Sequence, residues 1–141
     1  MKAIADPLRD VPLFADLSPR DLRQLAASMS EQVYADGDEV VKQGKSGVAF
    51  FVILEGRARV TQDGEEVGVL SAGDYFGEMA LIDGDHRAAS VHADGDLRCG
   101  ALTTWNFRPF VRDHPDVAWA LLTALVKRLR ETQARGVAAR G

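Results

Sequence analysis

The spacing of apolar residues changes twice along the chain, and each change predicts a different kind of secondary structure. Near the N-terminus, Ser18 and Pro19 precede Leu22 and Leu25, which recur at the spacing of one helix face. A serine N-cap followed by proline at the first helical position is a typical helix start. Residues 1–30 are therefore predicted to form a helical segment that packs on the rest of the domain.

From residue 31 to residue 104 the pattern changes to short apolar segments separated by turn signals. Pairs such as Asp36-Gly37 and Asp63-Gly64 interrupt it about every ten residues, which is the spacing of an all-β sandwich or barrel. The chain is predicted to be mainly β with flanking helices, and the β region to form an eight-stranded jelly-roll β-barrel. The clearest predicted strands lie at Val40-Val41, 50–54, 57–61, 66–70, 88–93 and 97–102.

Two further turn signals separate predicted strands, and alternation within the strands indicates which side chains face inward. Glu55-Gly56 and Asp94-Gly95-Asp96 are predicted to be turns, because glycine beside an acidic residue is typical of tight turns. The residues predicted to face the interior are Phe51, Ile53, Val60, Val67 and Leu70.

Beyond residue 104 the apolar spacing returns to that of helices, over residues 105–141. Asn106 is predicted to cap a short helix that ends before Pro115, because the residue preceding a proline resists helical geometry. Asp116 is predicted to cap a longer helix that ends near Arg135. Its apolar stripe is wide enough to serve two surfaces, one of them the barrel, and consists of Ala118, Leu121, Leu122, Leu125, Val126 and Leu129.

Length and composition predict one domain over residues 1–141, with parts at 1–30, 31–104 and 105–141. A net charge of −4 opposes affinity for nucleic acid over the whole surface. The longest apolar run, from Val48 to Leu54, is too short to span a membrane, and the first residues lack the apolar core of a signal peptide. The single cysteine, Cys99, favours a reducing compartment. We therefore expect a cytoplasmic protein without a metal, a nucleic-acid partner or a membrane partner.

One stretch combines a glycine turn, an acid, a short helix-forming run and an arginine. Gly77 has no Cβ, so its backbone can approach a ligand closely. The helical run after it would point free N–H groups and the positive end of its dipole at a phosphate. Arg87 can hold two phosphate oxygens through its planar guanidinium. Glu78 would repel an anion unless it faced another group, and a sugar hydroxyl fits that role.

The run Phe-Gly-Glu-Met-Ala-Leu at 76–81, followed by Arg-Ala-Ala-Ser-Val at 87–91, resembles the phosphate-binding cassette of the cyclic nucleotide-binding domain family. The resemblance implies that Glu78 takes the ribose 2′-hydroxyl and that Arg87 takes the cyclic phosphate. It also implies that backbone N–H groups of Gly77, Glu78 and Ala88 complete the cradle. The cassette residues expected to contact the ligand are Phe76, Gly77, Glu78, Met79, Ala80, Arg87, Ala88 and Ala89.

Three more residues are candidates for contacts with the rest of the nucleotide. Val67 could line the sugar and base side of the pocket, although core packing is the alternative for any valine here. Arg128 and Thr132 share a helix face and match positions from which activator-like members of the family reach the purine. Thr132 could bond the exocyclic amine and Arg128 the phosphate or the base. The alternative is a solvated pair on a frayed helix end.

The identity of the nucleotide is predicted from the residue after the cassette arginine. The resemblance implies that a threonine there favours guanine through its hydroxyl, and Ala88 removes that contact. We expect cAMP as the ligand, with cGMP bound more weakly.

The predicted function is that of a cyclic nucleotide receptor or regulatory domain, not an enzyme, whose C-terminal helix moves when the ligand binds. The expected protein partners are a second copy, through the C-terminal helix, or an effector protein, because we expect no second domain after that helix. Two alternatives stay open. The chain could be the regulatory domain of a larger effector, or a ligand-free interaction module in which Glu78 and Arg87 simply pair. A small hydrolase is a third class, but the sequence contains no metal-ligand cluster and no nucleophile beside a base.

Overall fold

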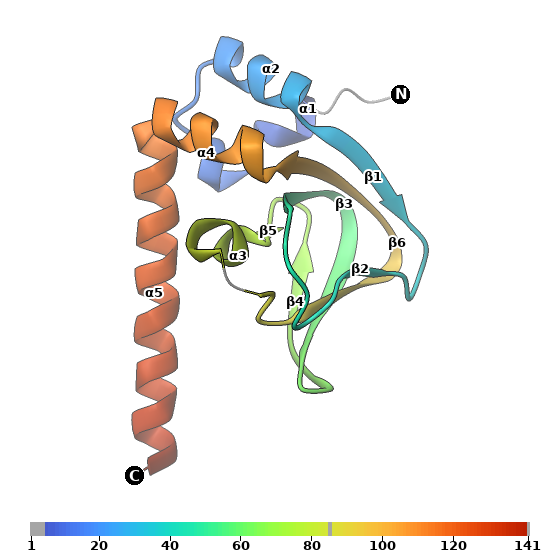
Figure 1. The fold of residues 1–141 in the computed structure, drawn as a ribbon, viewed down its shortest axis with the longest axis vertical. Coiled ribbons are helices and arrows are strands. Elements are labelled where there is room, and N and C mark those ends of the chain that lie inside the picture. Colours follow the sequence, from blue (N-terminus) through green and yellow to red (C-terminus); the bar gives the residue numbers. More distant parts are fainter. Residues whose placement is uncertain (1–4, 85, 141) are drawn as a thin grey trace.

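The computed structural model describes residues 5–84 and 86–140 of the chain, with their side chains except at positions 5, 6, 80 and 135–140. A curved sheet carries helices at one end, and a long helix runs along one side of it (Figure 1). The predicted class, mainly β with flanking helices, is confirmed. In chain order the elements are α1 (Ala5–Leu8), η1 (Pro12–Phe14), α2 (Pro19–Ser28), β1 (Ser30–Tyr34), β2 (Glu39–Val41), β3 (Ala49–Gln62), β4 (Glu65–Ser71), β5 (Tyr75–Phe76), α3 (Glu78–Asp83), β6 (Ser90–Thr103), α4 (Thr104–Asp113) and α5 (Pro115–Arg140).

The described strands form one antiparallel sheet built around its two longest members. The order is β1-β6-β3-β4, with β2 also paired to β6 and β5 to β3. The sheet curls without closing, and its strands number six among the described residues instead of eight. The reason is that β3 and β6 are each 14 residues long, and each contains two of the predicted strands.

The glycines at 56 and 95 lie in bulges, not in turns. The register of β3 against β6 shifts between Ile53 and Glu55 and again between Glu55 and Arg57. Gly56 has φ +94°, and a Cβ there would lie 2.3 Å from the carbonyl oxygen of Asp96. The predicted turns at Glu55-Gly56 and Asp94-Gly95-Asp96 are therefore wrong, because left-handed glycine serves a bulge inside a strand as well as a turn between strands.

Two apolar clusters hold the domain together. One lies between the sheet and the helical segments, and the other lies inside the curl of the sheet. The inner cluster includes Phe51 and Ile53, as predicted, with Val60 and Leu70 partly buried against it. Val67 is 58% exposed, so its predicted interior position is wrong. Val60 pairs with Gly68 and Thr61 with Glu66, so Val67 is the unpaired residue of a bulge and leaves the alternation.

Capping hydrogen bonds and backbone geometry decide where α2 and α4 begin and end. The hydroxyl of Ser18 accepts a hydrogen bond from the backbone N–H of Asp21, which confirms the predicted N-cap of α2. The predicted start of the next helix at Asn106 is wrong. The extended residue Thr103, at the end of β6, is the N-cap of α4, so the helix follows the strand directly. The predicted end before Pro115 is confirmed, because α4 ends at Asp113.

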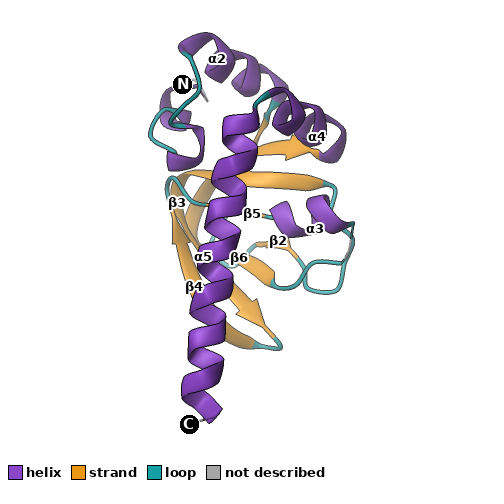
Figure 2. Cartoon of the chain, turned by 90° about the vertical axis from the view of Figure 1, so that its left-hand side faces the viewer, coloured by secondary structure: helices purple, strands orange, loops and turns teal. Residues whose placement is uncertain are grey.

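The last helix, α5, runs beside the sheet and projects past it in both views (Figures 1 and 2). Val117 and Leu121 are buried and hold its N-terminal half against the domain. Leu122 and Leu129 belong to the predicted stripe, yet both are more than half exposed. Much of the apolar stripe therefore faces solvent. None of the described helices combines the length and apolarity needed to cross a lipid bilayer.

Candidate functional site

The short strand β5 and helix α3 place the first half of the predicted cassette at the mouth of the curled sheet. Phe76 stacks on Phe51 of β3, with ring centroids 5.0 Å apart, which fixes β5 from the inside. Gly77 follows with φ +93°, a left-handed conformation that other residues rarely adopt. The helical turn predicted after Gly77 is confirmed as α3.

Arg87 lies inside the domain, only 7% exposed, although its side chain is charged. Its Nη1 donates a hydrogen bond to the carbonyl oxygen of Gly77 at 2.9 Å, and its Nη2 donates to that of Ala49 at 2.7 Å. Burial lowers the pKa of the guanidinium, and the carboxylate of Glu78 opposes part of that shift. Because arginine is ordinarily charged far above neutral pH, Arg87 places a fixed positive charge inside the site.

Glu78 is even more buried, at 2% exposure. Its Oε1 lies 3.4 Å from Nη1 of Arg128, which reaches it from α5. Among the side chains that the structure describes, Glu78 and Arg87 make no direct ion pair. The carboxylate and the guanidinium are thus two separate polar anchors near one another.

The long helix brings one of its two predicted residues to the cassette. Arg128 contacts Glu78, and its Nη1 also lies 3.9 Å from Sδ of Met79. Its side chain is 55% exposed, so solvent weakens its attraction to Glu78. The hydroxyl of Thr132 donates to the carbonyl oxygen of Arg128 at 2.9 Å, within the same helix.

The remaining predicted cassette residues carry small or apolar side chains. Ala88 is exposed and its carbonyl oxygen accepts a hydrogen bond from Nε2 of Gln62, while Ala89 is half-buried. Met79 is exposed on α3. The backbone of Ala80 lies in α3, but its side chain is outside the described part of the structure.

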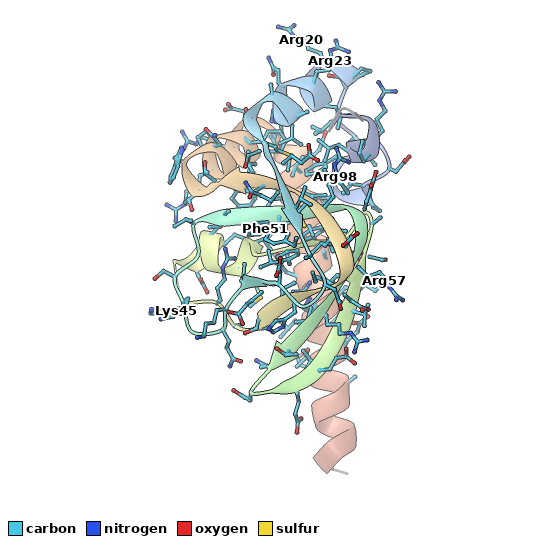
Figure 3. All side chains as sticks on the ribbon, turned by 90° about the vertical axis from the view of Figure 1, so that its right-hand side faces the viewer. Arg20, Arg23, Lys45, Phe51, Arg57 and Arg98 are labelled. Carbon is cyan, nitrogen blue, oxygen red and sulfur yellow. The ribbon has the colours of Figure 1, made fainter. Side chains whose placement is uncertain are left out.

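Sequence reasoning missed the loop between β2 and β3 as part of the site. The backbone N–H of Arg87 donates to the carbonyl oxygen of Lys45, and the N–H of Gly44 donates to that of Arg87. The close pair of glycines at 44 and 47 was the available signal. Figure 3 shows Lys45 at the periphery and Phe51 within the curl of the sheet. A cavity of about 210 Å³ lies here, lined by Val40, Val41, Lys42, Lys45, Ser46, Val48, Ala49, Phe51 and Arg87.

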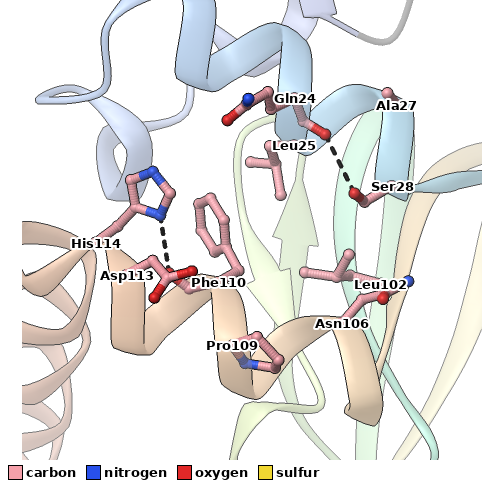
Figure 4. A pocket seen from close by; sticks show the side chains of 10 residues that line it. All are labelled: Gln24, Leu25, Ala27, Ser28, Leu102, Asn106, Pro109, Phe110, Asp113 and His114. Carbon is pink, nitrogen blue, oxygen red and sulfur yellow. Dashed lines mark hydrogen bonds between the residues drawn. The ribbon is translucent and has the colours of Figure 1, made fainter.

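A larger hollow of about 440 Å³ lies between α2 and α4, and none of the described residues that line it belongs to the cassette (Figure 4). The ring of His114 is tilted against that of Phe110 there, with centroids 4.4 Å apart, and its Nε2 lies 3.7 Å from a carboxylate oxygen of Asp21. No described group of three or more His, Cys, Asp or Glu side chains is arranged to hold a metal ion. The chemistry of the described residues therefore centres on the cassette, which offers one cation and one carboxylate to a polar ligand.

The family model, the related sequences and the solved structures all indicate the same family. The family model described as "Cyclic nucleotide-binding domain" matches residues 31–114. The cAMP-dependent protein kinase regulatory subunit of Mycosarcoma maydis is 48% identical over 112 residues, covering 74% of this chain and 21% of the relative. The cGMP-dependent protein kinase, isozyme 1, of Drosophila melanogaster is 38% identical over 114 residues, covering 75% of this chain and 15% of the relative.

A solved structure with the same fold is the catabolite activator protein of Thermus thermophilus. It superposes with a TM-score of 0.81 and 31% sequence identity, covering 88% of this chain and 61% of that chain. The chain therefore spans about a fifth of the kinase regulatory subunit and about three fifths of the activator that it resembles.

Proposed function

Because the chain belongs to the cyclic nucleotide-binding domain family, we propose that it is a receptor domain that binds cAMP more tightly than cGMP at the cassette around Arg87. In this proposal Arg87 holds the cyclic phosphate and Glu78 accepts a hydrogen bond from the ribose 2′-hydroxyl. Backbone N–H groups of Gly77, Glu78 and Ala88 complete the contacts with the phosphate.

The observation that carries the proposal is the burial of two opposite charges, on Arg87 and Glu78, that make no direct contact with each other. Arg87 is 7% exposed and Glu78 2%, yet their side chains form no mutual ion pair. A buried charge without a full set of partners is costly. A ligand that offers an anion to the arginine and a hydroxyl to the carboxylate would satisfy both. This contact pattern also argues against a ligand-free module held together by a Glu78–Arg87 pair.

The preference for cAMP rests on Ala88. Its methyl group offers no hydrogen bond to a guanine, whereas a hydroxyl at that position would. The proposal extends to Met79, Ala80 and Ala89 as neighbours of the ligand. Val67 is supported less well, because its exposed position in a bulge leaves it outside the packed interior.

We also propose that ligand binding changes how α5 sits on the cassette. Arg128 and the ribose hydroxyl would compete for the same buried carboxylate of Glu78, since Arg128 already lies 3.4 Å from it. A ligand that binds one arrangement of α5 better than another shifts the population between them. Thr132 would then approach the base only after its helix moves.

A movement of α5 transmits a signal only if another protein contacts the helix. The exposed face of α5 favours a second copy of the chain as that partner. Trp119, Leu122, Val126 and Leu129 follow three-four-three spacing and are all largely exposed, which is the seam of a coiled coil. An effector protein is the second candidate for this face, with the chain as the regulatory part of a larger protein. We propose a cytoplasmic setting and no catalytic step for the domain.

Calorimetric titration tests the proposal. The chain should bind cAMP more tightly than cGMP, and Arg87→Ala should weaken binding by at least about a hundredfold, because it removes the charge facing a buried phosphate. Arg20→Ala, an exposed arginine on α2, is the matched control and should bind as the wild type does. Equal affinity of wild type and Arg87→Ala would refute the site.

A further inference from the structure

Gly47, in the loop between β2 and β3, faces the guanidinium of Arg87 so closely that no side chain fits between them. A Cβ on Gly47 would lie 2.5 Å from Cζ, 2.6 Å from Nε and 2.8 Å from Nη2. These three atoms belong to one planar group and are nearly equidistant from that point. The backbone of Gly47 therefore lies against the flat face of the guanidinium.

A second glycine, Gly77, lies against one edge of the same guanidinium. A Cβ on Gly77 would lie 2.5 Å from Nη1 of Arg87. We call the space between Gly47 and Gly77 the glycine slot. Within it, Nη1 and Nη2 are bonded to the carbonyl oxygens of Gly77 and Ala49. The guanidinium is thus held on its face, at one edge and by two hydrogen bonds.

The Gly47 side of the slot cannot move away easily. The loop that carries Gly47 is bonded to the backbone of Arg87 itself, through Gly44 N–H to the Arg87 carbonyl at 2.9 Å and Arg87 N–H to the Lys45 carbonyl at 2.8 Å. Ser46 and His86 form a further bridge between the same two segments. A side chain at position 47 would therefore displace the guanidinium, not the loop.

We propose that Gly47 is a positioning residue for the cyclic phosphate. Its bare backbone lets the guanidinium lie flat, so that the donors not used by the two carbonyls face the anion in one orientation. A methyl group there turns the guanidinium out of that orientation and breaks at least one of its hydrogen bonds. This inference rests on the proposed function, in which Arg87 binds the phosphate.

The substitution Gly47→Ala separates positioning from folding. The φ of Gly47 lies outside the left-handed region, so alanine fits the backbone. Replacing such a glycine reduces the entropy of the unfolded chain, so any loss of stability comes from the displaced guanidinium. Gly68→Ala is the matched control, because Gly68 also lacks a left-handed φ and has no atom within 4 Å of its Cβ position.

The test is calorimetric titration with cAMP, together with thermal unfolding. Gly47→Ala should weaken binding by on the order of tenfold to a hundredfold, as expected for one lost charge-assisted hydrogen bond. Thermal unfolding checks that Gly47→Ala is folded at the titration temperature, and the affinity of Gly68→Ala should stay within about twofold of wild type. A Gly47→Ala protein that binds as tightly as Gly68→Ala would overturn the inference.

A double-mutant cycle shows whether Gly47 acts through Arg87. In an Arg87→Lys background the smaller ammonium escapes the clash, so Gly47→Ala should cost less than about threefold in further affinity. If Gly47→Ala lowered the affinity for cAMP by the same factor in both backgrounds, Gly47 would not act through Arg87.

A measurement without ligand separates this inference from the proposed function. The Nε–H resonance of Arg87 in a ¹H–¹⁵N spectrum should shift in Gly47→Ala and not in Gly68→Ala. If the wild type bound no cyclic nucleotide, the proposed function would fail, while an unchanged Arg87 resonance would overturn the glycine slot independently.

Discussion

Gly56 is the position where a single methyl group should disturb the fold most directly. Its φ of +94° costs an L-residue about 1–2 kcal/mol relative to glycine. A Cβ would also lie 2.3 Å from the carbonyl oxygen of Asp96 and 3.2 Å from Cα of Leu97. Both are backbone atoms of β6, which cannot rotate aside, so the two long strands must separate. Overpacking of this kind costs about 1–3 kcal/mol.

Together these terms predict that Gly56→Ala lowers the free energy of unfolding by about 2–5 kcal/mol, against a total of roughly 5–15 kcal/mol for a domain. The unfolding midpoint should fall by roughly 4 °C per kcal/mol at this size. Chemical denaturation and thermal unfolding followed by circular dichroism measure both quantities.

Two matched glycines divide the effect into its parts. Gly95 has φ +78° but no atom within 4 Å of its Cβ position, so Gly95→Ala should cost only the backbone share of about 1–2 kcal/mol. Gly68 has neither feature, and Gly68→Ala should be close to neutral. If Gly56→Ala and Gly95→Ala lost the same stability, the close approach of β3 and β6 at the bulge would carry no energetic weight, and the reasoning would fail.

Three further predictions concern the core, the contact of Arg128 with Glu78, and the exposed face of α5. Burial raises the pKa of Cys99 from 9.0 to about 12. The neutral thiol therefore stabilises the folded state fully below pH 9, and this stabilisation is lost above pH 9 at about 1.4 kcal/mol per pH unit. Cys99→Ala should flatten the fall in unfolding free energy from pH 9 to 10, and an unchanged slope would contradict this. Arg128→Ala should speed hydrogen exchange of the backbone amides in α5. It should lower the free energy of unfolding by less than about 1 kcal/mol, since Arg128 is half exposed. Unaltered exchange would mean that the contact of Arg128 with Glu78 does not hold the helix. Leu129→Glu should convert a dimer to a monomer in sedimentation velocity, because it places a charge in the exposed seam, and a wild type that sediments as a monomer would exclude pairing through α5.

The class of fold and the helical turn after Gly77 were predictable because their signals are local. Gly77, Glu78 and Arg87 stand at short, recognisable spacings, and the N-cap at Ser18 forms within one turn of helix. The alternation that places Phe51 and Ile53 inside also needs only neighbouring residues. Such features depend on backbone chemistry over a few positions, so the linear order already contains them.

The ends of the strands were harder to predict, because glycine beside an acidic residue occurs both in turns and in bulges. Gly56 and Gly95 became bulges only because β3 and β6 pair along their whole length across 14 residues each. The exposed position of Val67 follows from the same kind of register shift, and no count of residues in one strand reveals the register of its partner.

By itself, the order of residues determined that this chain is mainly β with helices at its ends, and that a glutamate and an arginine stand nine positions apart, at 78 and 87, because propensity and motif spacing act locally. The burial of both side chains came from the tertiary structure. Only the tertiary structure decided which groups meet. It brought Arg128 to Glu78 across 50 positions and placed the backbone of Gly47 against the guanidinium of Arg87. Long-range pairing sets such contacts, since atoms distant in the chain become neighbours only when the sheet curls and α5 packs beside it.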